Sequence, residues 1–213
     1  MQPLYLDNHL LLLDKPHGLL TQPSGTSEPS LEAQGKAWLK AEFCKPGAVF
    51  LEAVHRIDRV VGGVVLFART SKALSRLNDA MRNGAIRKRY IARVAASPPQ
   101  ESGVLTDWLL HGDGSAQLAR PDAPGAKRCE LSYVLKERCQ DGTSLLEIEL
   151  KTGRYHQIRL QLAHAGMPIL GDVKYGAPRD GGPAGGIALV SSRIDFEHPV
   201  THEGLSVVTR MMV

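Results

Sequence analysis

Residues 55–63 read HRIDRVVGG and place one carboxylate, Asp58, between the guanidinium groups of Arg56 and Arg59. Opposite charge beside a carboxylate favours its ionised form. An ionised carboxylate is suited to nucleophilic attack or to charge stabilisation, and poorly suited to proton donation. The alternative is a surface ion pair worth at most about 1 kcal/mol, and the spacing alone leaves both interpretations open.

The densest basic segment is RNGAIRKRYIAR, residues 82–93, which holds five cations and no acid. Arg87, Lys88 and Arg89 precede a strand-like run, and Tyr90 lies among them. Cations neutralise phosphates and an aromatic ring offers a stacking surface to a base, so this segment is a candidate RNA contact. The alternative is a solvated helix end followed by an edge strand with a core tyrosine.

A second dense segment is KTGRYHQIRLQLAHAG, residues 151–166. A helix that begins near Tyr155 places Gln157 and Arg159 on its first turns, where open N–H groups favour an anion. The alternative makes Arg159 a structural ion pair and assigns to the core Ile158, Leu160 and Leu162.

Metal and nucleotide cofactors have little support in the sequence. His55, Asp58, His156 and His164 could be read as metal ligands, but no HxH or HExxH spacing occurs. Neither GxGxxG nor GxxxxGK[ST] is present. We therefore predict no metal and no cofactor.

The order of elements predicts an α+β fold, with a central mixed and largely antiparallel β-sheet flanked by helices and loops. Helices are expected at 31–43, at 71–83 with Ser71 as N-cap and Gly84 after its end, and at 156–165 before Gly166. Leu74, Leu77 and Met81 form the apolar stripe of the second helix. Strands are expected in a hairpin over 4–14 and at 63–68, 89–94, 129–137, 144–152, 186–196 and 205–210, with surface loops at 112–126 and 176–186.

The totals are those of an ordinary globular protein with a basic balance. The chain has 213 residues, a net charge of +4 and a pI near 9.0, which permits an anionic partner. Its three cysteines form no CxxC pair, so neither a disulfide framework nor a zinc knuckle is indicated. The apolar run at 10–13 is too short for a signal peptide or a membrane span. We expect a cytoplasmic protein.

Five collinear segments resemble a known family. HRIDRVVGGVVLFA is similar to the HRLDxxTSGLLLFA signature of the RluA-type pseudouridine synthases. LYLDNHLLLLDKPHGLL resembles that family's opening hairpin, and KRYIARV resembles its second motif. KTGRYHQIRLQLAHAGMPILGDVKYG resembles its third motif, and FEHPV fits its final segment.

The resemblance implies an enzyme that converts uridine to pseudouridine in tRNA or rRNA without metal or cofactor. Asp58 then holds the place of the catalytic aspartate, which attacks the ribose C1′ or assists loss of the base through a glycal. Arg159 pairs with this aspartate, and Tyr90 packs on the uracil and helps to remove the C5 proton. Arg56 enters the RNA stack where the target base has left. The other predicted RNA contacts are Arg59, Arg87, Lys88, Arg89, Arg154, His156, Gln157 and Leu189.

Two segments depart from the family pattern. Val60-Val61-Gly62 stands where Thr-Ser-Gly is usual, and Leu189-Val190-Ser191 stands where Leu-His-Ala is common. Leu189 is expected to line the apolar wall of the uracil pocket. Because the three predicted catalytic residues are present, these departures are expected to affect substrate choice more than activity.

We expect residues 1–213 to form a single catalytic domain without a separate N-terminal RNA-binding domain, and to act as a monomer without an obligate protein partner. One alternative is a catalytically silent RNA-binding protein on the same scaffold. Another is a metal-dependent nuclease that uses His55, Asp58 and His156.

Overall fold

The backbone contacts of the computed structural model, which describes residues 1–213, divide the chain into two compact units. The first unit combines residues 1–88 with 190–212, and the second consists of residues 89–189 together with Val213. The sequence predicted one domain without an internal linker, and that assignment stays a prediction. No helix of the chain has the length and apolar character that a membrane crossing requires.

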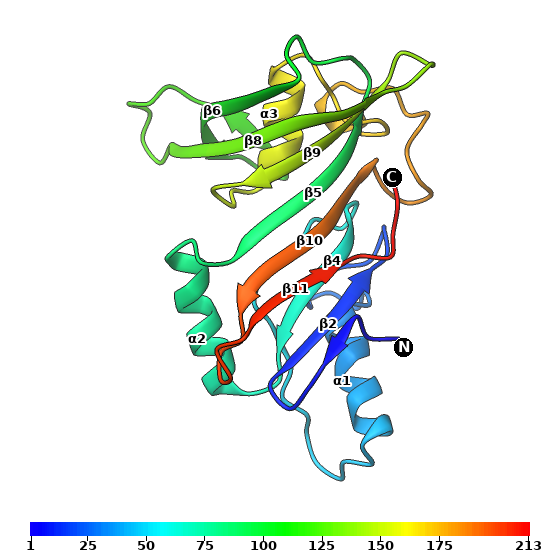
Figure 1. Cartoon of the computed structure of the whole chain (residues 1–213), viewed down its shortest axis with the longest axis vertical. Coiled ribbons are helices and arrows are strands. Elements are labelled where there is room, and N and C mark those ends of the chain that lie inside the picture. Colours follow the sequence, from blue (N-terminus) through cyan, green and yellow to red (C-terminus); the bar gives the residue numbers. More distant parts are fainter. The chain divides into compact units, whose positions relative to one another are not determined.

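The sheet of the first unit has the strand order β1-β2-β4-β10-β11, and β3 also pairs with β4 (Figure 1). Strand β10 runs parallel to β4 and antiparallel to β11, and the other pairs are antiparallel. The mixed, largely antiparallel α+β prediction is therefore confirmed. The strands are β1 (Tyr5–Leu6), β2 (Leu10–Lys15), β3 (Glu52–Ala53), β4 (Gly62–Ala68), β10 (Leu189–Glu197) and β11 (Gly204–Val208).

Helices cover both faces of this sheet. Side chains alternate along a strand, so Leu10 and Leu12 belong to the core cluster that contains Leu77 of α2 (Ser71–Arg82). Leu11 and Leu13 instead approach Gly35 in α1 (Leu31–Glu42). Burial on both faces explains why β4 has no polar side chain and why β2 begins with four leucines.

Side-chain caps fix where these helices begin. Ser30 accepts a hydrogen bond from the Ala33 N–H at 3.2 Å and caps α1. Thr70 does the same for α2 by accepting from Ala73 N–H at 3.2 Å. The sequence prediction of Ser71 as this N-cap is wrong by one residue, because the extended backbone of Thr70 aims its hydroxyl at the open N–H group.

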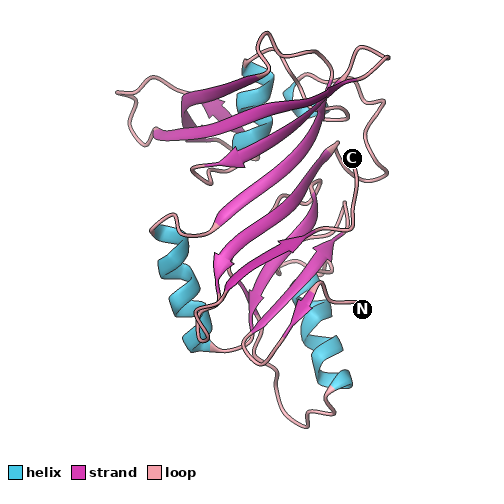
Figure 2. Cartoon of the chain, in the orientation of Figure 1, coloured by secondary structure: helices cyan, strands magenta, loops and turns pink.

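The second unit has the strand order β5-β9-β8-β6-β7, with α3 against β6 and β7 (Figure 2). Its strands are β5 (Arg87–Val94), β6 (Ser102–His111), β7 (Ala116–Leu118), β8 (Lys127–Arg138) and β9 (Ser144–Leu150). Helix α3 spans Gln157–His164, and a short 3₁₀ helix, η1, spans Val173–Tyr175. The sequence missed β6, whose apolar residues alternate weakly, and β7, which lies inside the predicted loop 112–126.

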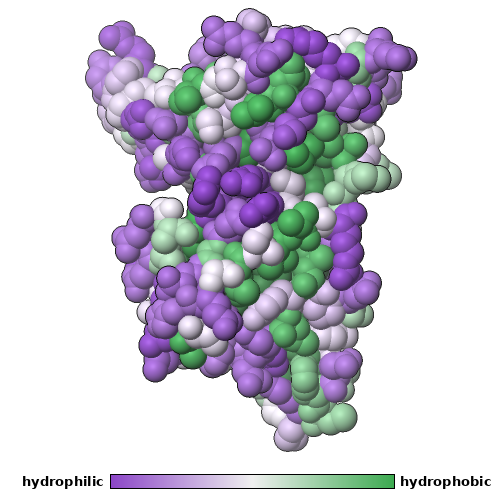
Figure 3. Space-filling view, in the orientation of Figure 1, coloured by the Kyte–Doolittle hydropathy of each residue, from purple (hydrophilic) through white to green (hydrophobic).

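Exposed apolar residues are scattered over the chain. They include Val104 and Val134 on β6 and β8, and Val208 on β11. Hydrophilic residues surround smaller hydrophobic areas on the face shown in Figure 3. Single exposed apolar side chains are ordinary on a globular protein and do not mark an interaction site.

Candidate active site

The loop that carries Asp58 joins β3 to β4 and is fixed on both sides of the aspartate. Both backbone groups of Ile57 bond to the Thr21 hydroxyl, which accepts from the N–H at 3.2 Å and donates to the carbonyl at 2.9 Å. On the other side, the Gly18 N–H donates to the Arg59 carbonyl at 2.8 Å, and the Val61 N–H closes a turn on the Asp58 carbonyl at 3.0 Å. Asp58 itself is half-buried, on a backbone that hydrogen bonds hold on both sides.

A buried lysine is hydrogen-bonded to the backbone of this loop. The side chain of Lys15 has no exposed surface, and its ammonium group donates to the carbonyls of Pro16, Leu19 and Arg59 at 3.1, 2.7 and 3.1 Å. Three acceptors match the three N–H bonds of an ammonium group. Burial lowers the pKa of Lys15 to about 8, and the negative charge of Asp58 opposes this fall. Lys15 is thus a cation that acts on Asp58 and that the sequence reasoning did not single out. The sequence feature that could have identified Lys15 is the Lys-Pro-x-Gly loop at residues 15–18.

The arginines beside Asp58 in sequence are placed differently from each other. Arg56 is exposed. Arg59 donates from Nε to the Gly18 carbonyl at 3.0 Å and pairs through Nη1 with Glu28 at 2.7 Å. The guanidinium group of Arg59 therefore ties the Asp58 loop to the segment around Gly18, a role that the sequence did not predict. The RNA contacts of both arginines stay predictions.

His55 is a structural residue of the same loop. Its Nε2 accepts a hydrogen bond from the Leu66 N–H at 3.1 Å, so the lone pair that a metal would need is already used. Burial, with a smaller effect from the positive charge of Lys88, lowers the pKa of His55 to about 3. The neutral ring then carries its proton on Nδ1, which is buried without a hydrogen-bond partner.

The two segments that depart from the family pattern pair with each other in the first unit. Gly62 pairs with Val190 and Gly63 with Ser191 in the parallel register of β4 and β10. A Cβ atom at Gly63 would lie 2.3 Å from the Ser191 carbonyl oxygen, and Gly63 has a φ of +107°. The backbone of Ser191 thus occupies the space beside Gly63. Val190 and Ser191 are buried, so the usual histidine of this strand is replaced where little solvent reaches.

Strand β5 carries the predicted RNA-contact run. Tyr90 is 6% exposed, and its ring lies on the same side of the strand as the buried Ala92 and Val94. Arg87 is exposed, whereas Lys88 is half-buried and burial lowers its pKa. The two side chains therefore differ in exposure, and their predicted phosphate contacts should differ in strength.

Arg89, in the same run, lies 3.7 Å from Glu149 through its Nε and is half-buried. An acid on the neighbouring strand therefore offsets part of its charge. The RNA contact of Arg89 stays a prediction.

Arg159 is held by an acid that the sequence did not reveal. Its Nε and Nη2 donate to the two carboxylate oxygens of Asp172 at 2.7 and 2.8 Å, and the two residues are 6% and 1% exposed. The guanidinium carbon also lies 5.0 Å from the centre of the Tyr175 ring. A bidentate pair and an aromatic face fix the plane of the guanidinium group. The structural ion pair considered for Arg159 is thus present, with Asp172 as the partner in its own unit.

Gln157 holds the start of α3. Its amide oxygen accepts from the Thr152 hydroxyl at 2.8 Å and from the Arg154 N–H at 3.0 Å. Its amide nitrogen donates to the Glu130 carbonyl at 3.1 Å and to the Gln161 side chain at 3.0 Å. All four hydrogen-bonding positions are used inside the protein. The predicted RNA contact of Gln157 stays a prediction, and it would require one of these bonds to break.

The remaining predicted contacts differ in exposure. Arg154 is exposed, and its Nε donates to the Arg128 carbonyl at 3.4 Å. His156 is 8% exposed and has left-handed backbone angles, and its Nδ1 lies 2.8 Å from the Tyr175 hydroxyl. Leu189 is 2% exposed at the start of β10, as expected for an apolar wall. Of these, only Arg154 presents a polar group to solvent without rearrangement.

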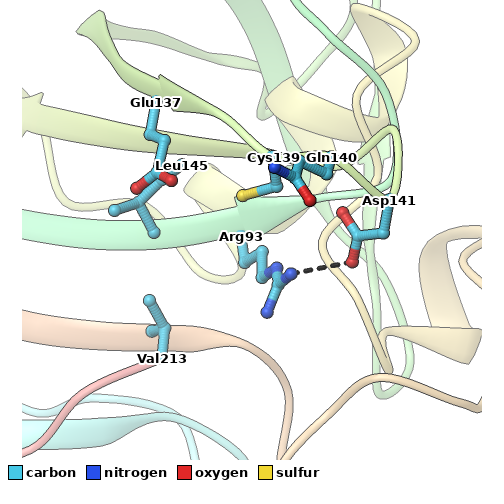
Figure 4. Close-up of a pocket in the computed structure, with 7 residues that line it drawn as sticks. All are labelled: Arg93, Glu137, Cys139, Gln140, Asp141, Leu145 and Val213. Atoms are coloured by element: carbon cyan, nitrogen blue, oxygen red, sulfur yellow. Dashed lines mark hydrogen bonds and ion pairs between the residues drawn. The ribbon is translucent and has the colours of Figure 1, made fainter.

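A separate hollow of about 500 Å³ lies in the second unit and contains none of the predicted site residues (Figure 4). Arg93 lies beside it and pairs with Asp141 at 2.8 Å, while its Nε donates to the Thr143 hydroxyl at 2.9 Å. Hydrogen bonds from Thr143, helped by the charge of Arg93, lower the pKa of Asp141. These contacts hold the turn between β8 and β9. The charged residues beside the hollow therefore have a structural role.

Comparisons with known proteins agree on the family. Residues 9–164 match the family described as RNA pseudouridylate synthase. The chain is 30% identical over 203 residues to the dual-specificity RNA pseudouridine synthase RluA of Escherichia coli K12, covering 92% of this chain and 86% of that protein. It is 30% identical over 206 residues to the uncharacterized RNA pseudouridine synthase YhcT of Bacillus subtilis, covering 94% of this chain.

A solved structure shares the fold. The human RNA pseudouridylate synthase domain containing 4 superposes with a TM-score of 0.81 at 21% identity, covering 98% of this chain and 88% of that one. The chain spans 65% of the length of the B. subtilis protein and 62% of the ribosomal large subunit pseudouridine synthase C of Buchnera aphidicola strain APS. The family match contains Asp58, Tyr90 and Arg159. This chain belongs to the RNA pseudouridylate synthase family and is of the RluA type.

Proposed function

We propose that this protein isomerises uridine to pseudouridine in RNA, with Asp58 as the catalytic residue. The observation that carries the proposal is the anchoring of the Asp58 loop, inside the segment that matches the family, by Thr21, Gly18 and Lys15. A carboxylate on a fixed backbone and beside a buried cation is preorganised to attack or to stabilise charge. Asp58 belongs to the first unit and Tyr90 and Arg159 to the second. The meeting of the three side chains is part of the proposal.

The proposed reaction conserves all atoms of the nucleotide. Asp58 attacks the ribose C1′ while the bond to uracil N1 breaks, or it assists the same bond cleavage by a glycal route. The freed uracil turns and forms a new bond from C5 to C1′, and the bond to Asp58, where one was made, is released. Tyr90 helps to remove the C5 proton, and N1 takes up a proton. No external reactant is required.

The RNA substrate is proposed by analogy with the relatives. One relative is named as a ribosomal large subunit synthase and another as a dual-specificity RNA synthase, which makes rRNA a candidate. The second candidate, tRNA, comes from the family resemblance of the sequence motifs. Arg56, Arg87 and Arg154 are exposed cations, and exposed cations can neutralise phosphates. We expect the protein to act as a monomer in the cytoplasm.

The substitution Asp58→Asn tests the function directly. Asparagine keeps the shape of the side chain but removes its charge, so we expect more than about 100-fold loss of turnover with little change in fold or RNA affinity. Tritium release from transcripts labelled at uridine C5, made from 23S rRNA and tRNA genes, measures turnover. Activity within about tenfold of the wild type, or about 1.4 kcal/mol of barrier, would contradict the role of Asp58. A wild type that binds these transcripts but releases no tritium would favour the silent RNA-binding alternative.

A further inference from the structure

A column of aromatic rings runs through the second unit from the surface to Arg159. The ring of His111 lies 4.5 Å from that of Tyr155, which stacks on His156 at 3.8 Å and an interplanar angle of 21°. His156 then meets Tyr175 edge to face at 5.6 Å, and the guanidinium carbon of Arg159 lies 5.0 Å from the Tyr175 ring. The column joins the end of β6, the segment before α3, and η1.

The inner end of the column is rigid. The Tyr175 hydroxyl accepts from the Ala116 N–H at 2.9 Å and lies 2.8 Å from His156 Nδ1. Burial raises the pKa of Tyr175, and its hydroxyl also donates to the Ala116 carbonyl at 3.5 Å. His156 is almost fully buried. Tyr155 is therefore backed by a ring that is itself held by a hydrogen bond.

The outer end of the column is open. His111 is exposed at the last position of β6, where its backbone pairs with Ala116, its ring makes no hydrogen bond or ion pair, and Tyr155 is its one ring contact. Tyr155 is half-exposed. The His111 ring is tilted by 41° against Tyr155, and no polar contact of the ring explains its position.

Two cations without acidic partners adjoin the open end. Arg154 precedes Tyr155 and is exposed. Lys174 precedes Tyr175, and its ammonium group donates to the Gly114 carbonyl at 2.6 Å, in the turn that follows His111. Asp113 is the one acid of that turn. A flat ring flanked by cations is the combination that binds a nucleobase together with its phosphates.

We propose that His111 and Tyr155 form a stacking site for one base of the bound RNA, apart from the reacting uridine. The site rests on the proposed function in that it takes RNA as the ligand. His156 and Tyr175 separate it from Arg159, so the stacked base is a neighbour of the target and not the target itself. A base held there would fix the register of the strand relative to Arg159.

Binding of a fluorescein-labelled 12-mer of oligouridylate, measured by anisotropy, tests the site. His111→Ala should weaken binding about tenfold, within the range for loss of one base stack. His111→Phe should bind within about twofold of the wild type, because phenylalanine stacks but carries no ring nitrogen. The control is His164→Ala, which removes an exposed histidine elsewhere in the same unit and should leave the Kd within about twofold of the wild type.

The dependence of the Kd on salt separates stacking from phosphate contact. His111→Ala should leave the slope of log Kd against log salt unchanged, whereas Arg154→Ala should lower it by about 0.7. Equal affinity of His111→Ala and the wild type, equal weakness of His111→Phe and His111→Ala, or no binding by the wild type tighter than about 10⁻⁴ M would overturn the site. Tritium release reports the proposed function separately. A wild type that makes pseudouridine but binds RNA independently of His111 refutes the stacking site alone. Binding that depends on His111 without any pseudouridine refutes the catalytic proposal alone.

Discussion

The guanidinium group of Arg159 makes two hydrogen bonds to Asp172, and this determines what a substitution at Arg159 measures. Both side chains are buried, so the removal of one leaves an uncompensated charge in the interior. The effect of Arg159→Ala on stability therefore includes the loss of the Asp172 pair. A catalytic role of Arg159 should appear in turnover as well.

We expect Arg159→Ala to cost about 3–5 kcal/mol of unfolding free energy and to abolish turnover. Asp172→Asn should restore part of that stability in the double variant, because neither position then carries a buried charge. Arg159→Lys should keep more stability than alanine but little activity, since lysine lacks the planar two-pronged donor. Urea denaturation measures the free energies, and Arg128→Ala, which breaks an exposed pair with Glu130, serves as the control at about 1 kcal/mol or less. Strictly additive losses at Arg159 and Asp172 would contradict this account of the pair.

At the scale of the elements, the sequence predicted the strands and helices that have a strong local signal. The apolar runs of β2 and β4, the Asp7-Asn8 turn and the glycine after α3 were all recognised, because each depends on residues within a few positions. Strand β6 was missed because its own residue pattern is weak. It is a strand because it pairs with β7 and β8. Asp172 and Lys15 were missed for a similar reason. Their roles depend on groups brought to them by the fold, 13 residues away for Asp172 and 44 for the Arg59 carbonyl at Lys15.

The β4–β10 pair gives a prediction for an element. Gly63→Ala would place a methyl group against the Ser191 backbone and force a side chain into a positive-φ conformation. We expect a loss of at least about 2 kcal/mol, seen as a fall of the thermal midpoint by about 4–8 °C. Gly204→Ala in β11, where nothing lies within 4 Å of the new Cβ atom, should stay within about 0.5 kcal/mol. Similar losses of unfolding free energy in Gly63→Ala and Gly204→Ala would contradict a stabilising role for the close backbone contact at Gly63.

At the scale of the whole molecule, the net charge of +4 acts on a partner through the exposed cations, and not every cation of the basic run is exposed. Arg87 and Lys88 are neighbours in sequence, but burial lowers the pKa of Lys88 and leaves Arg87 as the exposed member. The basic run is therefore less strongly charged toward solvent than its composition suggests.

This difference predicts unequal salt effects. Arg87→Ala should reduce the slope of log Kd against log salt by about 0.7–0.9 on transcribed RNA, because one counterion fewer is released. Lys88→Met should change the slope less, and turnover at saturating RNA should stay close to that of the wild type for Arg87→Ala. Arg82→Ala is the matched control, since Arg82 is an exposed arginine at the end of α2, outside the predicted RNA contacts. If Arg87→Ala leaves the slope of log Kd against log salt unchanged, the basic run is a solvated surface and not an RNA contact.

The division of the chain into units has a consequence for its synthesis. The second unit is one continuous stretch, whereas the first needs residues 1–88 together with residues 190–212. Strand β4 acquires its partner β10 only after the whole second unit has been translated. Roughly 100 residues take about 5–20 s to translate, at the usual rates of elongation. During that interval β2 and β3 can already pair with β4, but Gly62 and Gly63 lack the β10 backbone that lies beside them in the finished fold. The first unit therefore completes its sheet only after the second unit has been synthesised.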